Sequence, residues 1–64
     1  MTLDLTIPDL ACSACVETVT KAVRAIDAGA EILADTQTKQ VTIVTYASEV
    51  AIKDAITAAG YTVA

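Results

Sequence analysis

Apolar and polar side chains alternate at the start of the chain. Within residues 2–7, one face collects the apolar positions Leu3, Leu5 and Ile7. This period of two predicts a half-buried β-strand. Pro8 ends the strand, because proline has no backbone N–H to donate to a sheet.

The apolar spacing then changes to steps of three and four. Residues 13–27 are predicted to form a helix whose buried face holds Val16, Val19, Val23 and Ile26. Ser13 stands at the expected N-cap, and Gly29 stands where a left-handed residue often closes a helix.

Two short strands and a second helix are predicted next. Residues 30–35 and 40–46 form the strands of a hairpin, joined by four polar residues. Ser48 caps the second helix and Gly60 ends it, and its buried stripe comprises Ile52, Ala55, Ile56 and Ala59. Residues 61–63 are long enough for a short final strand.

The order of elements is therefore βαββαβ. We expect an α+β fold, a ferredoxin-like βαββαβ sandwich in which two helices cover one face of a four-stranded antiparallel sheet. The chain has 64 residues and no Gly-rich or Pro-rich break, so residues 1–64 are predicted to form a single domain.

Charge and composition exclude several function classes. Eight acidic and four basic residues give a net charge of −4. Nucleic acids and anionic membranes bind clusters of Lys and Arg, so neither is an expected partner.

No apolar run approaches the roughly 20 residues that cross a bilayer, and no signal peptide is evident. We therefore expect a cytoplasmic protein that is not membrane-inserted. The absence of histidine removes the usual general base, and we expect no enzyme.

The two cysteines are the candidate functional residues. Cys12 falls in the predicted loop and Cys15 in the first helical turn, where free backbone N–H groups and the helix dipole favour thiolate. Two thiolates without an imidazole form a soft site of low coordination number. Such a site suits Cu(I) better than Zn(II), which prefers four ligands, or an iron–sulfur cluster held by four cysteines. Whether the carboxylate of Asp9 reaches this site is left open by the sequence.

Two other interpretations of the cysteine pair stay open. Cysteines can act as small core hydrophobes, although a loop and a helix start are unusual places for them. A CxxC pair can also perform thiol redox chemistry. The thioredoxin-type fold is longer, however, and its sites usually include an aromatic residue and a downstream proline that are missing here.

These features together resemble the heavy-metal-associated domain family, which comprises small copper chaperones and the soluble metal-binding domains of copper-transporting P-type ATPases. The signature is Leu-Ala-Cys-Ser-Ala-Cys at residues 10–15, followed by Ala-Ala-Gly-Tyr at residues 58–61. The resemblance extends from the first strand to Val63. The pattern is particularly similar to that of stand-alone bacterial and cyanobacterial chaperones.

The resemblance implies roles for four residues. Cys12 and Cys15 are expected to be the Cu(I) ligands. Leu10 stands where the family commonly has Met, and it is expected to pack beneath the loop without binding metal. Tyr61 is expected to shield the site or to form a hydrogen bond near a sulfur. The alternative is that Tyr61 is an aromatic residue at the edge of the core that happens to lie nearby.

The same resemblance implies a copper chaperone that transfers Cu(I) by ligand exchange to a metal-binding domain of a copper-transporting P-type ATPase. The alternatives are such an ATPase domain itself and a small thiol redox protein. Met1 directly before the first strand favours a free-standing protein. The partner, the direction of transfer, the affinity and a copper-bridged homodimer all stay open.

Overall fold

Five of the six predicted elements are present in the structure. The computed structural model describes residues 1–64. Each observed element begins and ends within two residues of its predicted position. In chain order the elements are β1 (Thr2–Thr6), α1 (Ser13–Ile26), β2 (Glu31–Ala34), β3 (Gln40–Val44) and α2 (Glu49–Ala58).

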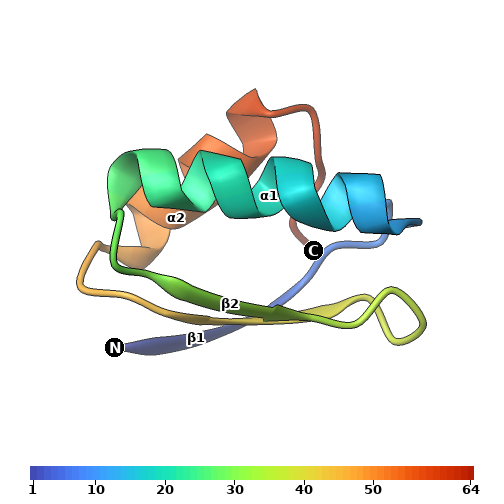
Figure 1. The fold of residues 1–64 in the computed structure, drawn as a ribbon, viewed down its shortest axis with the longest axis horizontal. Helices are drawn as coiled ribbons and strands as arrows, with labels where there is room; N and C mark the ends of the chain where they lie inside the picture. The colour runs from blue at the N-terminus through green and yellow to red at the C-terminus, as the bar shows by residue number, and fades with distance from the viewer.

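The fold has two layers, with both helices on one face of an antiparallel sheet (Figure 1). The strand order is β1-β3-β2, so β3 is central and pairs with both neighbours. Ile43 lies opposite Leu3 on one side and Ile32 on the other. Because alternate residues of a strand share a face, this register points the apolar positions of all three strands at the helices.

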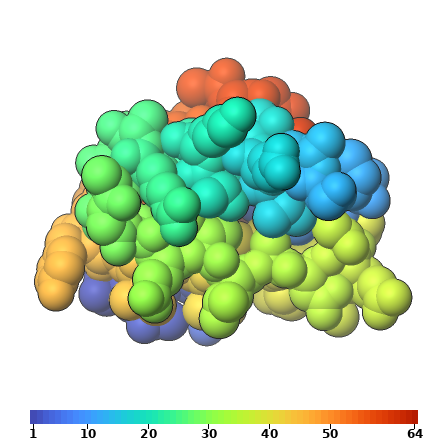
Figure 2. Space-filling model, in the orientation of Figure 1, coloured from blue at the N-terminus to red at the C-terminus, as the bar shows by residue number.

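The core fills the space between these two layers, and the helices cover it from above (Figure 2). Val19 and Val23 of α1 and Ile52 and Ile56 of α2 are fully buried, as the helical periodicity predicts. The prediction is wrong for Ile26, the last residue of α1, which is 49% exposed. The remaining buried apolar residues come from the strands and loops and are Leu3, Leu5, Ile7, Leu10, Ala30, Val41 and Ile43. A chain this short depends on this one compact cluster, because its surface is large relative to its volume.

The predicted fourth strand is wrong. The sheet has three strands, and residues 61–64 form no regular element. One backbone hydrogen bond joins this segment to β1, from the Ala64 N–H to the Thr6 carbonyl, with an N···O distance of 2.8 Å. The Thr62 N–H instead donates to the carboxylate of Asp9, at 3.1 and 3.2 Å to its two oxygens. A side chain has therefore taken a donor that a continuous β-ladder would require.

Both predicted caps of α2 are confirmed, whereas the predicted N-cap of α1 is wrong. The Ser48 hydroxyl accepts a hydrogen bond from the Ala51 N–H at 3.2 Å and caps α2, and Gly60 follows α2 with φ 98°. The N-cap of α1 is Cys12 rather than Ser13, with extended backbone and no side-chain hydrogen bond to the helix. The Cys12 side chain is therefore not used by the helix and is free for other chemistry.

Asp27 closes α1 in place of the left-handed Gly29 that was predicted. The Asp27 backbone is extended and its N–H donates to the Val23 carbonyl, whereas Gly29 has no positive φ. The Asp27 carboxylate accepts hydrogen bonds from the Thr45 hydroxyl at 2.7 Å, the Tyr46 N–H at 3.1 Å and the Gly29 N–H at 3.1 Å. One ionised side chain thus joins the end of α1 to the connection between β3 and α2.

These hydrogen bonds make the fold sensitive to acid at Asp27. They favour the ionised carboxylate and lower its pKa, with the Thr45 hydroxyl as the largest cause. A depressed pKa stabilises the folded state above the unfolded pKa of about 3.9, and this stability is lost as the pH falls through the folded pKa.

We expect Asp27→Asn to lower the thermal midpoint at pH 7 and to weaken its dependence on pH between pH 5 and pH 2, measured by circular dichroism. Asp54→Asn, which removes the same charge from an exposed site on α2, is the control and should do neither.

Candidate metal site

A β-turn leads from β1 toward the cysteines. The Leu10 N–H donates to the Ile7 carbonyl at 3.0 Å, which closes a four-residue turn with Pro8 at its second position. Proline suits that position because its ring fixes φ near the required value. Ile7 and Leu10 are both fully buried, so each end of the turn is attached to the core. Leu10 is thus a core residue at the base of the loop, and its predicted role in the metal site stays a prediction.

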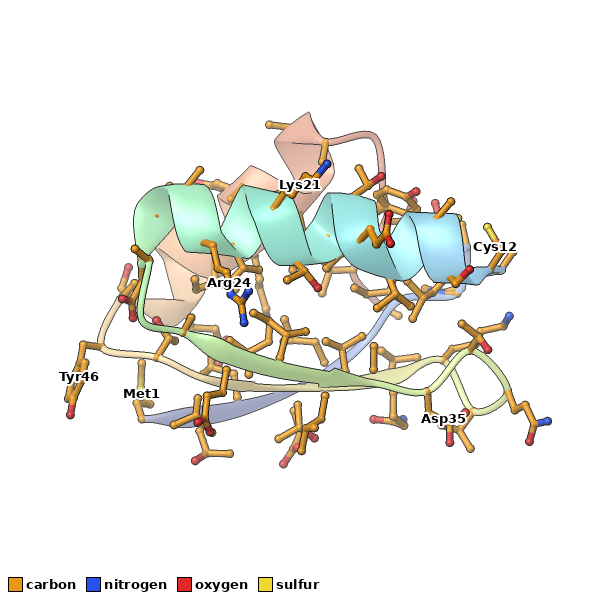
Figure 3. The ribbon with its side chains drawn as sticks, viewed as in Figure 1. Met1, Cys12, Lys21, Arg24, Asp35 and Tyr46 are labelled. Carbon is orange, nitrogen blue, oxygen red and sulfur yellow. The ribbon has the colours of Figure 1, made fainter.

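The two cysteines lie together at one end of the molecule. The Sγ atoms of Cys12 and Cys15 are 3.3 Å apart, close enough for one thiol to donate to the other sulfur. Both thiols are free, with Cys12 exposed and Cys15 half-buried. Cys12 projects into solvent at the start of α1, at the opposite end of the longest axis from Tyr46 and Met1 (Figure 3). The site is a convex loop that another molecule can approach directly.

The surroundings of Cys15 favour its thiolate. Its pKa is lowered from the ordinary 9.0 to about 7, and the hydroxyl of Tyr61 is the largest cause. The Ala11 N–H and the Cys12 thiol lower it further by donating to the sulfur, which outweighs the opposing effect of partial burial. The lowered pKa favours the thiolate of Cys15, which is the form that binds metals. The same interaction raises the pKa of Tyr61, because the phenol is favoured while it donates to Cys15.

Asp9 positions the tyrosine and is not a candidate metal ligand. The hydrogen bonds from the Thr62 N–H to the Asp9 carboxylate hold residue 62 against the loop that precedes α1. Tyr61, the preceding residue, is half-buried and packs against the core. The two interpretations of Tyr61 are thus compatible, since it packs at the core edge and also interacts with Cys15.

The chain offers two donors to a metal and no third. No group of three Cys, Asp or Glu side chains lies close enough to hold an ion. With metal–sulfur bonds of about 2.3 Å, sulfurs at the observed separation would meet a metal at an angle of about 90°. A linear arrangement needs the sulfurs about 1.3 Å further apart, which rotation of the exposed Cys12 side chain can supply.

Lys39 contacts this loop, although nothing in its sequence neighbourhood indicates such a contact. The sequence predicts only that it belongs to the polar connection between two strands. In the structure its Nζ atom donates to the Leu10 carbonyl at 2.7 Å, two residues before Cys12. The backbone at Lys39 has φ 66°, a left-handed conformation that the local sequence does not predict.

The only surface pocket lies away from the cysteines. It is shallow, and it is lined by Met1, Gly29, Glu31, Val44, Thr45 and Tyr46 at the end of the molecule remote from Cys12. The candidate metal site is therefore an exposed loop and not a cavity. Neither α1 nor α2 is long and apolar enough to span a membrane.

The chain belongs to the heavy-metal-associated domain family, whose model matches residues 4–62. It is 45% identical to the copper chaperone Atx1 from Synechocystis PCC6803, solved in a trimeric form with a histidine-to-tyrosine substitution. That match covers 97% of this chain and 98% of the other, with a TM-score of 0.94. The family resemblance in the sequence is thus confirmed.

Two further solved structures show the range of the family. The chain is 45% identical to a cyanobacterial copper metallochaperone, ScAtx1, over 100% of both chains, with a TM-score of 0.82. It is 32% identical to a gold binding protein, over 94% of this chain and 92% of the other, with a TM-score of 0.88. A comparison with curated proteins gave no significant match.

Removing the Tyr61 hydroxyl should raise the pKa of Cys15. We expect Tyr61→Phe to move it from about 7 upward toward 9.0, because the variant loses the largest cause of the shift. The pKa rises because the thiolate is less stable without this hydrogen-bond donor. Cys15 is then mostly protonated at pH 7. The measurement is the ¹³Cβ chemical shift of Cys15 between pH 5 and pH 10. Tyr46→Phe, at a tyrosine that is 99% exposed, is the matched control.

Substitutions at Leu10 should show how much its packing contributes to stability. Leu10→Ala should lower the free energy of unfolding by about 2–5 kcal/mol, the usual range for truncating a fully buried leucine. Leu10→Met keeps the volume and should cost less than about 1.5 kcal/mol. Urea unfolding of the metal-free protein gives both values. A small cost for Leu10→Ala would contradict the packing role.

Proposed function

We propose that this protein is a copper chaperone that binds Cu(I) through Cys12 and Cys15. The observation that carries the proposal is the pair of free thiols 3.3 Å apart, one on the exposed loop and one in the first turn of α1. Soft thiolate ligands select Cu(I), zinc and iron–sulfur clusters, and Cu(I) is the one that accepts a site of low coordination number. Zn(II) prefers four ligands, and this chain supplies two, so we place Zn(II) second.

The incomplete site also suits transfer by ligand exchange. A thiolate from a partner can approach the exposed side of the loop and bind the metal before Cys12 or Cys15 releases it. The bound ion then never has to enter water as a free ion. In this mechanism Cys12, the more exposed sulfur, is the ligand that exchanges first, and Cys15 holds the ion beside Tyr61.

The similarity to known chaperones supports the same proposal. The matches include copper chaperones at 45% identity over nearly the whole chain. The gold binding protein shows that this fold also carries a site for another soft metal. We propose the metal-binding domain of a copper-transporting P-type ATPase as the recipient and the cytoplasm as the place of transfer. We propose no enzymatic activity, since binding and exchange require no bond-making in a substrate.

The structure gives a specific reason to keep one alternative class. A thiol whose pKa is lowered to about 7, with a second sulfur 3.3 Å away, is also the starting point for thiol–disulfide exchange. A soluble domain of an ATPase would use the same site as a free chaperone. A copper-bridged homodimer would place two such loops face to face.

An anaerobic Cu(I) titration against a coloured competing chelator tests the proposal. We expect one Cu(I) per chain, with binding lost in the double variant Cys12→Ser, Cys15→Ser. In the same assay Zn(II) should compete poorly. Mixing the loaded protein with an isolated ATPase metal-binding domain should transfer the ion faster than it is released to buffer.

The remaining outcomes separate the alternatives. Cysteine-independent or weak Cu(I) binding would overturn the chaperone proposal. Tighter Zn(II) than Cu(I) binding would make zinc the cargo. Rapid reduction of a test disulfide by the metal-free protein, together with no Cu(I) binding, would favour the redox class.

A further inference from the structure

Lys39 binds both ends of the turn that leads to the cysteines. Its backbone carbonyl accepts a hydrogen bond from the Ile7 N–H at 2.9 Å. Its Nζ atom donates to the Leu10 carbonyl at 2.7 Å, across 29 residues of sequence. The turn itself is closed by the hydrogen bond between Leu10 and Ile7. One residue of the hairpin between β2 and β3 thus fixes a turn that belongs to a different part of the chain.

The surface view shows that the two segments are neighbours. At one end of the molecule the hairpin atoms, coloured yellow-green, lie directly below the blue atoms of the loop before α1 (Figure 2). The Lys39 side chain is half-buried there, which restricts it more than a freely solvated lysine.

The backbone of Lys39 is held in an unfavourable conformation. Its φ of 66° lies in the left-handed region, which costs an L-residue other than glycine about 1 kcal/mol or more. The Lys39 N–H donates to the Asp35 carbonyl at 2.8 Å, so the hairpin turn enforces this conformation. Strain of this kind persists where surrounding contacts over-determine the residue, and it is frequent at functional sites.

Lys39 also differs from the other three basic side chains. Lys53 pairs with Glu49 on α2 at 3.0 Å. Arg24 donates to the Ala30 carbonyl near the end of α1, and Lys21 points away from the sheet (Figure 3). Lys39 alone donates to the loop before α1. Two extended residues span at most about 7 Å, so its charge lies within about one Debye length of the Cys12 backbone.

We propose that Lys39 is a positioning residue for the metal site. It fixes the loop geometry through Leu10 and supplies a positive charge near the two thiolates. This inference rests on the proposed binding of Cu(I) by Cys12 and Cys15. Cu(I) and two thiolates together carry one net negative charge, in a protein whose own net charge is −4. The nearby ammonium group stabilises that complex, and the fixed loop reduces the entropy lost on binding.

The test measures two properties of each variant: the rate at which it loses Cu(I) to a chelator, and amide hydrogen exchange in the loop before α1. We expect Lys39→Met to speed Cu(I) transfer to a chelator about three- to fifteenfold, the effect of one charge at roughly 10 Å with and without salt screening. In the metal-free protein, amide hydrogen exchange at residues 9–12 should also become faster. Lys39→Arg, which keeps the charge and the donor, should restore both properties.

Two further variants are controls for misfolding and for the loss of a positive charge elsewhere on the protein. Lys39→Asn suits the left-handed backbone but is too short to reach Leu10, so it should keep the fold and behave like Lys39→Met. Lys53→Met removes the same charge on α2 and should change neither property. Wild-type copper release and exchange in Lys39→Met would overturn the inference, as would equal effects from Lys53→Met.

The inference and the proposed function can fail separately. If the wild-type protein binds no Cu(I) through its cysteines, the proposed function fails. Amide exchange at residues 9–12 then decides the positioning role alone. Faster exchange in Lys39→Met supports that role, and unchanged exchange overturns it.

Discussion

Burial of Ile7 and Leu10 on either side of one β-turn holds the cysteine loop to the core of the protein. A loop that presents sulfur atoms to a partner has to expose its side chains while its backbone stays in place. The protein separates these requirements by residue: two buried apolar side chains anchor the turn, and Cys12 two residues later is exposed. α1 begins at the next residue, Ser13, so the helix fixes the position of the backbone on the other side of Cys12.

The electrostatics of the site depend on short-range donors more than on net charge. An acidic protein opposes the formation of further anions, yet the Cys15 pKa is lowered. The donors responsible are a phenol from the C-terminal segment, a backbone N–H at the helix start and the neighbouring thiol. Such contacts act over one hydrogen-bond length and are little affected by salt, whereas the negative surface charges act through solvent and are screened. The protein can thus remain acidic overall and still present a reactive thiolate.

The sequence predicts most of this fold because its elements follow from local rules. Helical spacing located α1 and α2, alternation located β1 and β3, and the hydroxyl of Ser48 marked the start of α2. The CxxC spacing brought Cys12 and Cys15 together for the same reason, since their separation is set by one turn of chain. The errors arose where a distant partner decided the outcome. Asp9 took the N–H of Thr62 from the expected fourth strand, and nothing near Lys39 in sequence reveals that it contacts Leu10.

The missing fourth strand leaves Tyr61 outside the ladder of the sheet. Backbone donors join residues 61–64 to three other parts of the molecule: the Tyr61 N–H donates to the Ile56 carbonyl, the Thr62 N–H to the Asp9 carboxylate and the Ala64 N–H to the Thr6 carbonyl. Tyr61 is therefore held by the end of α2 and by packing at the core edge, and no strand partner is involved. A substitution at Tyr61 can change the donor to Cys15 without removing a residue pair from the β1-β3-β2 sheet. The chemistry of the sulfur and the integrity of the sheet can thus be altered independently of each other.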